Sequence, residues 1–403
     1  MRLDYFTTTS PWPETTGARL RVRAIYDALS SHDIDVRLIV VGERPDAATC
    51  VRIERTGGAV YPNHSDALLT KAIRYLHGAL VGRDPVAGQF FDAAGLEHFG
   101  RLVAARQPDA VLLGNVFLAP LIPKLQALLP TMGIIVDNHN VESLLHQRMG
   151  APGEPLHVRV PASIVERTSR NLERQYLSRA HQVWACSDVD AGYLRRAYRL
   201  PRVHTIPNAI DTDSFARSGE EEAGAIVFTG TLWHPPNDQA AHRLIEISQQ
   251  LRSRGIRHRL YIVGQGPKPG LKRKARQHPD VVLTGAVPDI KAFIARASVV
   301  AAPLEVGSGT KLKVLQAMSM GKAVITTAIG AEGLQLTDGI HAIVADDRDF
   351  EGHLVRLLQS PEDRARLGAA ARSHVVDLFS LEALRQRMGD ALREILPSVA
   401  LAG

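Results

Sequence analysis

The strongest constraint on the fold is an alternation of short β-branched runs with amphipathic helical stretches, which occurs twice along the 403 residues. Such alternation is typical of parallel sheets covered by helices. The runs expected as strands in the first half are residues 3–6, 36–41, 110–113, 133–136 and 182–185. Those in the second half are residues 225–228, 260–263, 281–283, 299–301 and 324–326. The sequence therefore predicts an α/β protein with two Rossmann-like, doubly wound parallel-sheet domains.

A polar stretch without periodicity separates the two halves. Residues 211–224 include three consecutive glutamates and show the composition of a linker. We predict a first domain over residues 1–210, a second over 211–378 and a final helix within 379–403. That helix carries one apolar stripe, and crossing back to the first domain would supply the partner that the stripe needs. The stripe consists of Leu381, Leu384, Met388, Leu392 and Ile395.

Composition excludes several classes of protein. The formal net charge of +6 is spread over both halves, so no nucleic-acid partner is expected. Cys50 and Cys186 are too few for a disulfide framework or a four-cysteine metal site. The first residues lack the apolar core of a signal peptide, and residues 111–130 contain too many polar residues and prolines for a membrane span. We expect a cytoplasmic protein.

One segment contains most of the features expected of a binding site: residues 303–327, PLEVGSGTKLKVLQAMSMGKAVITT. A glycine loop leads there into a helix expected to begin near Thr310. Unpaired N–H groups and the positive end of a helix dipole suit a phosphate, and Lys311 and Lys313 would add full charges. An ordinary loop whose lysines face water explains the same residues equally well.

A second polar group follows the predicted strand at residues 133–136. Asp137 and His139 should lie at the carboxyl end of that strand, where open α/β sheets bind ligands. A structural role is the alternative for a histidine in a loop. Near the N-terminus, Gly17 suits either a close approach to a ligand or a helix start, and its neighbours Arg19 and Arg21 are expected to face solvent.

No metal site is predicted. The 16 histidines show no HExxH pair, and the Asp-x-Asp pattern at Asp188 and Asp190 recurs at two other places by chance. Ser187 and Asp188 are better interpreted as helix-capping residues. Gly264 and Gly266 lack the third glycine of a dinucleotide fingerprint, so NAD is not expected.

Further motifs occur in a consistent order along nearly the whole chain. They are SPWPETTGARLR, VDNHNVESLL, ACSDVDAGYL, IPNAIDTDSF, FTGTLWHPPND, YIVGQGP, LTGAVPDIKAFIARASVVAAPL and IGAEGL. Together with residues 303–327, this series resembles glycosyltransferase family 4, the group 1 glycosyl transferases of GT-B fold.

The resemblance implies two domains facing across a cleft and a hexosyltransferase-like enzyme. It implies retaining transfer from a nucleotide-sugar donor to a hydroxyl acceptor, in polysaccharide or glycolipid assembly, with neither metal nor other cofactor. His139 would be the catalytic residue, in contact with the transferred sugar or the acceptor. The residues that the resemblance assigns to nucleotide and donor binding are Gly17, Gly230, Thr231, Gly264, Val287, Ser308, Gly309, Thr310, Lys311, Leu312, Lys313 and Gln316.

The sequence departs from the family pattern at two places. The family's helix usually carries two glutamates eight residues apart, where this chain has Ser308 and Gln316. Gln316 can donate to and accept from ribose hydroxyls, without charge-assisted bonds. Residues 230–238 also lack the Arg and Lys that hold the diphosphate in many members, which would leave that role to Lys311 and Lys313. Two rival functions therefore stay open, a nucleotide-sugar 2-epimerase of the same fold and a non-catalytic binding or scaffold protein.

The resemblance also suggests a partner at the membrane, because many relatives extend lipid-linked sugars at its cytoplasmic face. Residues 66–82 have the pattern of an interfacial helix, which is equally that of a helix packed on a sheet. The expected partners are a nucleotide-sugar donor, a sugar or lipid-linked sugar acceptor and the inner face of the cell membrane, contacted peripherally. The arginines that would attract an anionic surface are Arg195, Arg196, Arg199 and Arg202.

Overall fold

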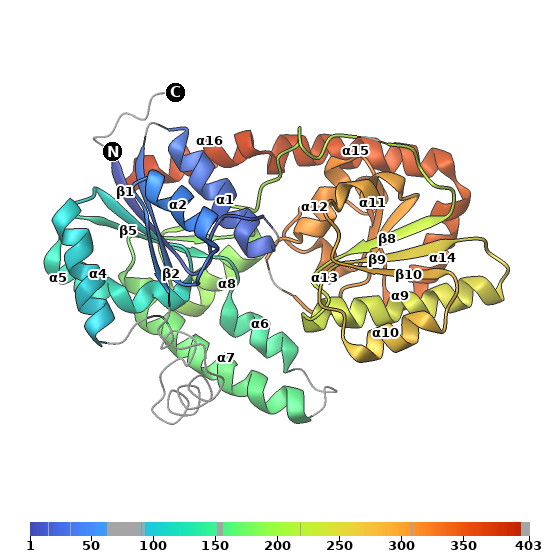
Figure 1. Cartoon of the computed structure of the whole chain (residues 1–403), viewed down its shortest axis with the longest axis horizontal. Helices are drawn as coiled ribbons and strands as arrows, with labels where there is room; N and C mark the ends of the chain where they lie inside the picture. Colours follow the sequence, from blue (N-terminus) through green and yellow to red (C-terminus); the bar gives the residue numbers. More distant parts are fainter. Residues whose placement is uncertain are drawn as a thin grey trace. The chain divides into compact units, whose positions relative to one another are not determined.

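A computed structural model describes residues 1–14, 16–32, 34–62, 90, 93–150, 156–217, 219–307 and 309–395. The chain divides into two compact units (Figure 1). The first contains Met1–Asn208 and the chain from Leu384 onward, and the second contains Ala209–Ala383. The predicted interfacial helix at residues 66–82 lies outside the described residues.

The first unit is built on a seven-stranded sheet in the order β3-β2-β1-β4-β5-β6-β7, and every recorded pairing is parallel. Its central strands are buried on both faces, which explains their continuous apolar runs. The order reverses between β1 and β4, the kind of switch point where open α/β sheets bind ligands. The strands are β1 (Arg2–Thr7), β2 (Asp35–Gly42), β3 (Ala59–Pro62), β4 (Ala110–Leu113), β5 (Gly133–Asn138), β6 (Gln182–Ala185) and β7 (Val203–Thr205).

The second unit repeats this plan with a six-stranded sheet in the order β10-β9-β8-β11-β12-β13, again parallel. Its switch point lies between β8 and β11. The predicted fold class, two doubly wound parallel-sheet domains, is therefore confirmed. The strands are β8 (Ala225–Thr229), β9 (Arg259–Val263), β10 (Val281–Gly285), β11 (Val299–Ala302), β12 (Ala323–Thr326) and β13 (Ile343–Val344).

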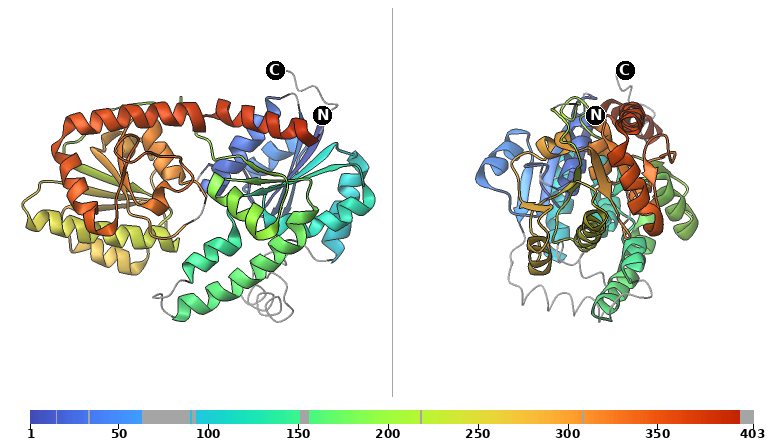
Figure 2. Two further views of the ribbon diagram at one scale, coloured as in Figure 1. Left: turned by 180° about the vertical axis from the view of Figure 1, so that it is seen from behind. Right: turned by 90° about the vertical axis from the view of Figure 1, so that its right-hand side faces the viewer.

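Helices cover both faces of each sheet (Figure 2). Those of the first unit are α1 (Gly17–Ser30), α2 (Ala47–Arg55), α4 (Ala93–Arg106), α5 (Ile122–Leu128), α6 (Glu142–Met149), α7 (Leu156–Tyr176) and α8 (Asp188–Tyr198), with two 3-10 segments at Val116–Leu121 and Leu177–Arg179. Those of the second are α9 (Pro235–Ser253), α10 (Pro269–Arg276), α11 (Lys291–Arg296), α12 (Leu312–Ser319), α13 (Ala328–Ala331), α14 (Asp347–Gln359) and α15 (Pro361–Phe379).

Three strands were not predicted from the sequence: β3, β7 and β13. All three lie at the edge of a sheet and have four residues or fewer. An edge strand is covered less completely than a central one, so its apolar signal is weak, and such a short run has too few positions to show a period. The ten predicted strands are all the internal strands of the two sheets and one edge strand, β10.

The last helix, α16 (Leu381–Ile395), contacts the first unit from Leu384 onward. The Gln182 side chain donates a hydrogen bond to the Ala391 carbonyl at 2.7 Å, and a His32 ring nitrogen lies 3.0 Å from the Arg385 carbonyl oxygen. The buried face of α16 includes Leu384, Met388 and Leu392. The units are divided after Asn208 and after Ala383, instead of at the expected residues 210 and 378.

Candidate functional site

At the carboxyl end of the second sheet, two neighbouring loops each begin with a glycine. Gly230 follows β8 and its N–H donates to the Val263 carbonyl at 2.9 Å, while Gly264 follows β9. A Cβ atom on Gly264 would lie 1.7 Å from the Gly230 oxygen, so any side chain there would force the loops apart. A Cβ atom on Gly230 would lie 3.0 Å from the Lys313 ammonium nitrogen. Because neither glycine has a side chain, the two loops pack closely and the Lys313 ammonium group lies against the backbone of Gly230.

Lys313, on the first turn of α12, is held under this loop. Its ammonium group donates to the side-chain oxygen of Asn237, and the Asn237 amide donates to the Thr231 carbonyl at 2.9 Å. The ammonium nitrogen also lies 4.6 Å from the centroid of the Phe228 ring. Asn237 therefore links the Gly230–Thr231 loop to the lysine, and the alternative of a fully solvated lysine does not hold for Lys313.

The electrostatics of Lys313 are unusual for a lysine. Burial lowers its pKa, and the charge of Lys311 lowers it further, to about 7. Among the described residues the ammonium form therefore lacks a compensating anion, because a carboxylate partner would instead raise the pKa. A phosphate beside Lys313 would supply the missing negative charge.

The glycine loop before α12 combines a left-handed glycine with a buried threonine. Gly309 adopts φ = +63°, a conformation that favours glycine, and Thr310 is buried. The Lys311 ammonium group donates to the Gly309 carbonyl at 2.6 Å, and α12 begins at Leu312, two residues later than expected. Ser308 lies outside the described residues.

Three further predicted donor residues lie on two segments of the second unit. Gln316, on α12, is 6% exposed, and its side-chain amide makes no hydrogen bond to any described residue. Val287 follows β10 and is half-buried against the core of the unit. Leu312 packs against the same core. Their roles in nucleotide and donor binding stay predictions.

The first unit places a buried charged cluster at the carboxyl end of β5. The Arg21 guanidinium, on α1, donates to both carboxylate oxygens of Asp137, through Nε at 3.0 Å, and to the Asn208 side-chain oxygen at 3.1 Å. Nε2 of His139 lies 3.3 Å from Oδ2 of the same carboxylate. The ring of His139, the predicted catalytic residue, therefore lies beside the carboxylate, although its Nε2 makes no hydrogen bond to a described residue.

The prediction that Arg21 faces solvent is wrong. The residue is 3% exposed, because a bidentate pair with Asp137 compensates its burial. Burial alone would raise the pKa of Asp137, but the Arg21 charge and the adjacent His139 ring lower it to about 2. Asp137 is therefore ionised at neutral pH.

The loop between β1 and α1 is fastened by Arg19. Its guanidinium donates to the Trp12 carbonyl at 2.7 Å and pairs with Glu43, which also accepts from the Ser10 N–H. Arg19 is half-buried, so it too differs from the expected solvated side chain. Gly17 is the exposed first residue of α1, and its predicted role at the donor stays a prediction.

Sequence reasoning missed the partners that complete each cluster: Asn237 and Phe228 in the second unit, Arg21 and Asn208 in the first. Asn237 was detectable in principle, because it follows two prolines at the start of a helix after a strand-end glycine. Arg21 was not, since its partner lies 116 residues away in the sequence.

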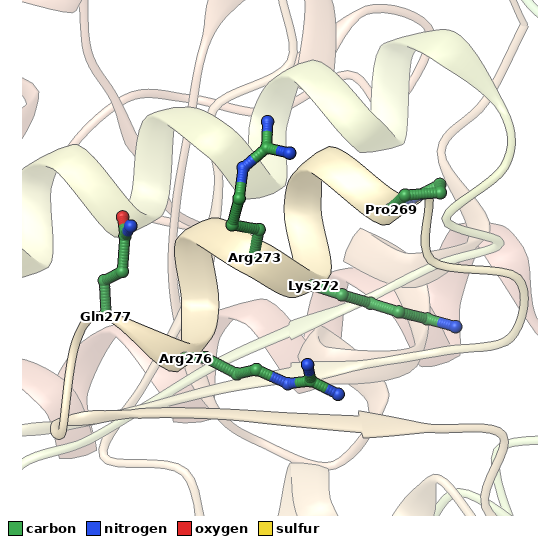
Figure 3. Close-up of a pocket in the computed structure, with 5 residues that line it drawn as sticks. All are labelled: Pro269, Lys272, Arg273, Arg276 and Gln277. Carbon is green, nitrogen blue, oxygen red and sulfur yellow. The ribbon is translucent and has the colours of Figure 1, made fainter.

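Other candidate sites lie apart from these clusters. A cavity of about 580 Å³ is lined by five residues of α10 and its end, with Lys272 and Arg276 pointing to the same side of the helix (Figure 3). None of the residues predicted to bind the donor lines this cavity.

Ser187 caps α8, as predicted, because its side chain accepts a hydrogen bond from the Asp190 N–H at 3.0 Å.

Neither a metal-binding cluster nor a membrane-spanning helix is present in the described part of the chain. No group of three or more His, Cys, Asp or Glu side chains there is placed to hold a metal ion. No helix within those residues has both the length and the apolar character to cross a bilayer.

Solved structures with the same arrangement define the class of fold. The sucrose-phosphate synthase of Thermosynechococcus elongatus superposes with a TM-score of 0.75 at 15% identity, over 99% of this chain and 100% of that chain. HepE of Anabaena, in complex with UDP and glucose, matches with 0.67 at 15% identity, over 99% and 100%. A glycosyltransferase from Rickettsia africae matches with 0.68 at 11% identity, over 99% of each chain. The fold is GT-B.

Sequence comparison then identifies the family. Residues 15–214 match the model described as Glycosyltransferase Family 4, and residues 223–360 match that of Glycosyl transferases group 1. No curated protein sequence matches. The chain belongs to glycosyltransferase family 4, the group 1 glycosyl transferases, as the motif series predicted.

Proposed function

We propose that this glycosyltransferase moves a sugar from a nucleotide-sugar donor to a hydroxyl acceptor, with retention of configuration at the anomeric carbon. The observation that carries the proposal is the Lys313 ammonium group beneath the Gly230 loop, held by Asn237 with no carboxylate partner in the part of the chain that the structure describes. A diphosphate is the anion that this class of enzyme would bring to such a position. HepE, a GT-B neighbour, was solved with UDP and with UDP-glucose.

Each part of the donor has a set of residues that suits it. Gly309 and Thr310, before α12, present backbone toward the diphosphate, while Lys311 and Lys313 supply charge in place of the missing basic pair. Gln316 offers its amide to the ribose hydroxyls, and Val287 adjoins the base. His139, which lies beside Asp137, contacts the transferred sugar or the acceptor.

The chemistry then depends on charge stabilisation and positioning. The acceptor oxygen bonds to the anomeric carbon as the bond from that carbon to the diphosphate breaks, on the same face of the sugar. The acceptor proton passes to an oxygen of the departing diphosphate. Lys313 and the backbone N–H groups stabilise the negative charge that develops on the leaving group, which is the largest single contribution in many transfer reactions. Neither a metal nor another cofactor takes part.

Turnover is therefore expected to survive a chelator. The test incubates the purified protein with a panel of nucleotide sugars, with and without lipid extract, in the presence and absence of EDTA. Glycosylated product under both conditions, with retained anomeric configuration by NMR, supports the proposal. Loss of activity with EDTA and its recovery with manganese or magnesium would contradict metal independence and the retaining assignment. Donor turnover without any acceptor would favour the 2-epimerase, and binding without turnover would favour a scaffold protein.

We further propose a lipid-linked sugar acceptor at the cytoplasmic face of the membrane. Arg196, Arg199 and Arg202 are all exposed around the end of α8, where an anionic surface would attract each by roughly 1 kcal/mol. Sedimentation with anionic vesicles should exceed that with neutral vesicles and fall at high salt. The double variant Arg196→Ser/Arg202→Ser should pellet less, whereas Lys272→Ser/Arg276→Ser on α10 is the matched control. Equal, negligible pelleting with both vesicle types would exclude the membrane partner.

A further inference from the structure

The three tryptophans of the chain differ sharply in exposure. Trp12 is 7% exposed and Trp184 is 0% exposed, whereas Trp233 is 58% exposed. An indole is the largest apolar side chain and is normally buried over most of its area. Trp233 belongs to the short loop between β8 and α9 that also carries Gly230. An exposed indole in that loop calls for a reason.

The loop holds Trp233 in a fixed position. Leu232, its neighbour, is fully buried and donates its N–H to the Gln265 carbonyl at 2.8 Å. On the other side, the N–H of His234 donates to the Thr231 carbonyl at 3.2 Å, and α9 begins at the next residue. A Cβ atom on Gly266 would lie 2.7 Å from Cδ1 of the indole. The absence of a side chain at Gly266 is therefore what lets the ring pack against the β9 loop.

The indole is also close to the proposed diphosphate position. It lies three residues beyond Gly230, at the carboxyl end of β8. His234, whose ring packs edge to face with Trp233 at 6.1 Å, has its pKa lowered by burial and by the nearby Lys313 charge. Gly230, at the start of the same loop, lies against the Lys313 ammonium group, because a Cβ atom built there would be 3.0 Å from that nitrogen.

We propose that Trp233 is a stacking surface for a sugar ring bound beside the donor diphosphate. This inference rests on the proposed function. The proposed function assigns the base to Val287 and the ribose to Gln316, which lie on other segments. The remaining part of the ligand beyond the diphosphate is the transferred sugar, and this loop is in position to contact it. A pyranose has a flat face of C–H groups, which matches a rigid, exposed indole face. The ring is that of the donor sugar or of the acceptor sugar, which share this chemistry.

Acrylamide quenching of tryptophan fluorescence tests the proposal directly, since Trp233 is the accessible tryptophan. The probes are a set of nucleoside diphosphates, the matching nucleotide sugars, and glucose or N-acetylglucosamine added with the nucleoside diphosphate. Calorimetry identifies the nucleotide that binds. This measurement tests the proposed function independently of Trp233. If none binds, the proposed function fails and the inference fails with it.

We expect the nucleoside diphosphate to bind and leave Trp233 open to acrylamide. Protection by the nucleotide sugar identifies the donor ring, and protection only after free sugar is added identifies an acceptor ring. Full protection by the nucleoside diphosphate itself would show that base or phosphate covers the indole and would overturn the proposal. A bound nucleotide with no protection by any sugar would overturn it too.

Variants provide a second measurement. Trp233→Ala should raise the KM for the sugar-bearing substrate about tenfold and leave nucleoside diphosphate affinity within about twofold. Trp233→Phe should restore most of the loss because it keeps an aromatic face. Ile340→Ala removes another exposed apolar side chain of the second unit, at 50% exposure, and is the matched control. Equal losses for nucleoside diphosphate and nucleotide sugar in Trp233→Ala would contradict a sugar subsite.

Discussion

The variant Lys313→Ala is expected to bind the donor's nucleoside diphosphate roughly 10- to 100-fold more weakly than the unmodified protein, because a hydrogen bond to a charged group contributes about 1.5–3 kcal/mol. Isothermal calorimetry at pH 6.5 measures the change. Lys311→Ala should have a smaller effect, since the Lys311 ammonium group already donates to the Gly309 carbonyl. Lys272→Ala removes the same charge from exposed α10 and is the matched control.

The binding should also depend on pH, with a sign set by the pKa of Lys313. That pKa is about 7 in the free protein, and a bound diphosphate favours the ammonium form and raises it. Above pH 7, binding must therefore take up a proton, and affinity should fall as pH rises. Calorimetry at pH 8 in two buffers of different ionisation enthalpy should show uptake close to one proton, lost in Lys313→Ala. Unchanged affinity in both Lys311→Ala and Lys313→Ala would exclude the idea that these lysines replace the basic pair.

The second large effect is expected on stability. Arg21→Met leaves the Asp137 carboxylate buried without its partner, and breaking a buried ion pair in this way costs about 3–5 kcal/mol of unfolding free energy. Urea unfolding followed by the fluorescence of buried Trp184, in the same unit, measures the loss. Arg23→Met is the matched control on the same helix, since Arg23 pairs with Asp27 at the surface and such a pair contributes less than about 0.5 kcal/mol.

Low pH should remove the difference in unfolding free energy between the unmodified protein and Arg21→Met. The pKa of Asp137 in the folded protein is about 2, below its ordinary value of 3.8, so its contribution to stability is present above pH 4 and is lost as pH falls toward 2. The gap in unfolding free energy between the unmodified protein and Arg21→Met should therefore be widest at pH 7 and shrink below pH 4. A variant as stable as Arg23→Met at pH 7 would show that the ion pair contributes nothing.

Much of the fold was predictable because central parallel strands are buried on both faces. Such a strand is a continuous run of apolar residues, as at residues 110–113 and 299–301. The run can be recognised from neighbouring positions alone, without knowledge of the strand's distant partners. The edge strands β3, β7 and β13 contain less of that signal, and they were missed.

Within the candidate site, the glycine positions and the ordered motifs that place the chain in its family could be recognised without a structure. Which charges are buried became visible only in the folded protein. Arg19 and Arg21 are two residues apart on one helix, yet Arg21 is the one paired with buried Asp137, 116 residues away. Lys311 and Lys313 are likewise close in sequence, and Asn237, 76 residues away, holds only Lys313 under the Gly230 loop. The physical reason is that a charge becomes buried only where a distant group compensates its desolvation, and local spacing contains no information on that group.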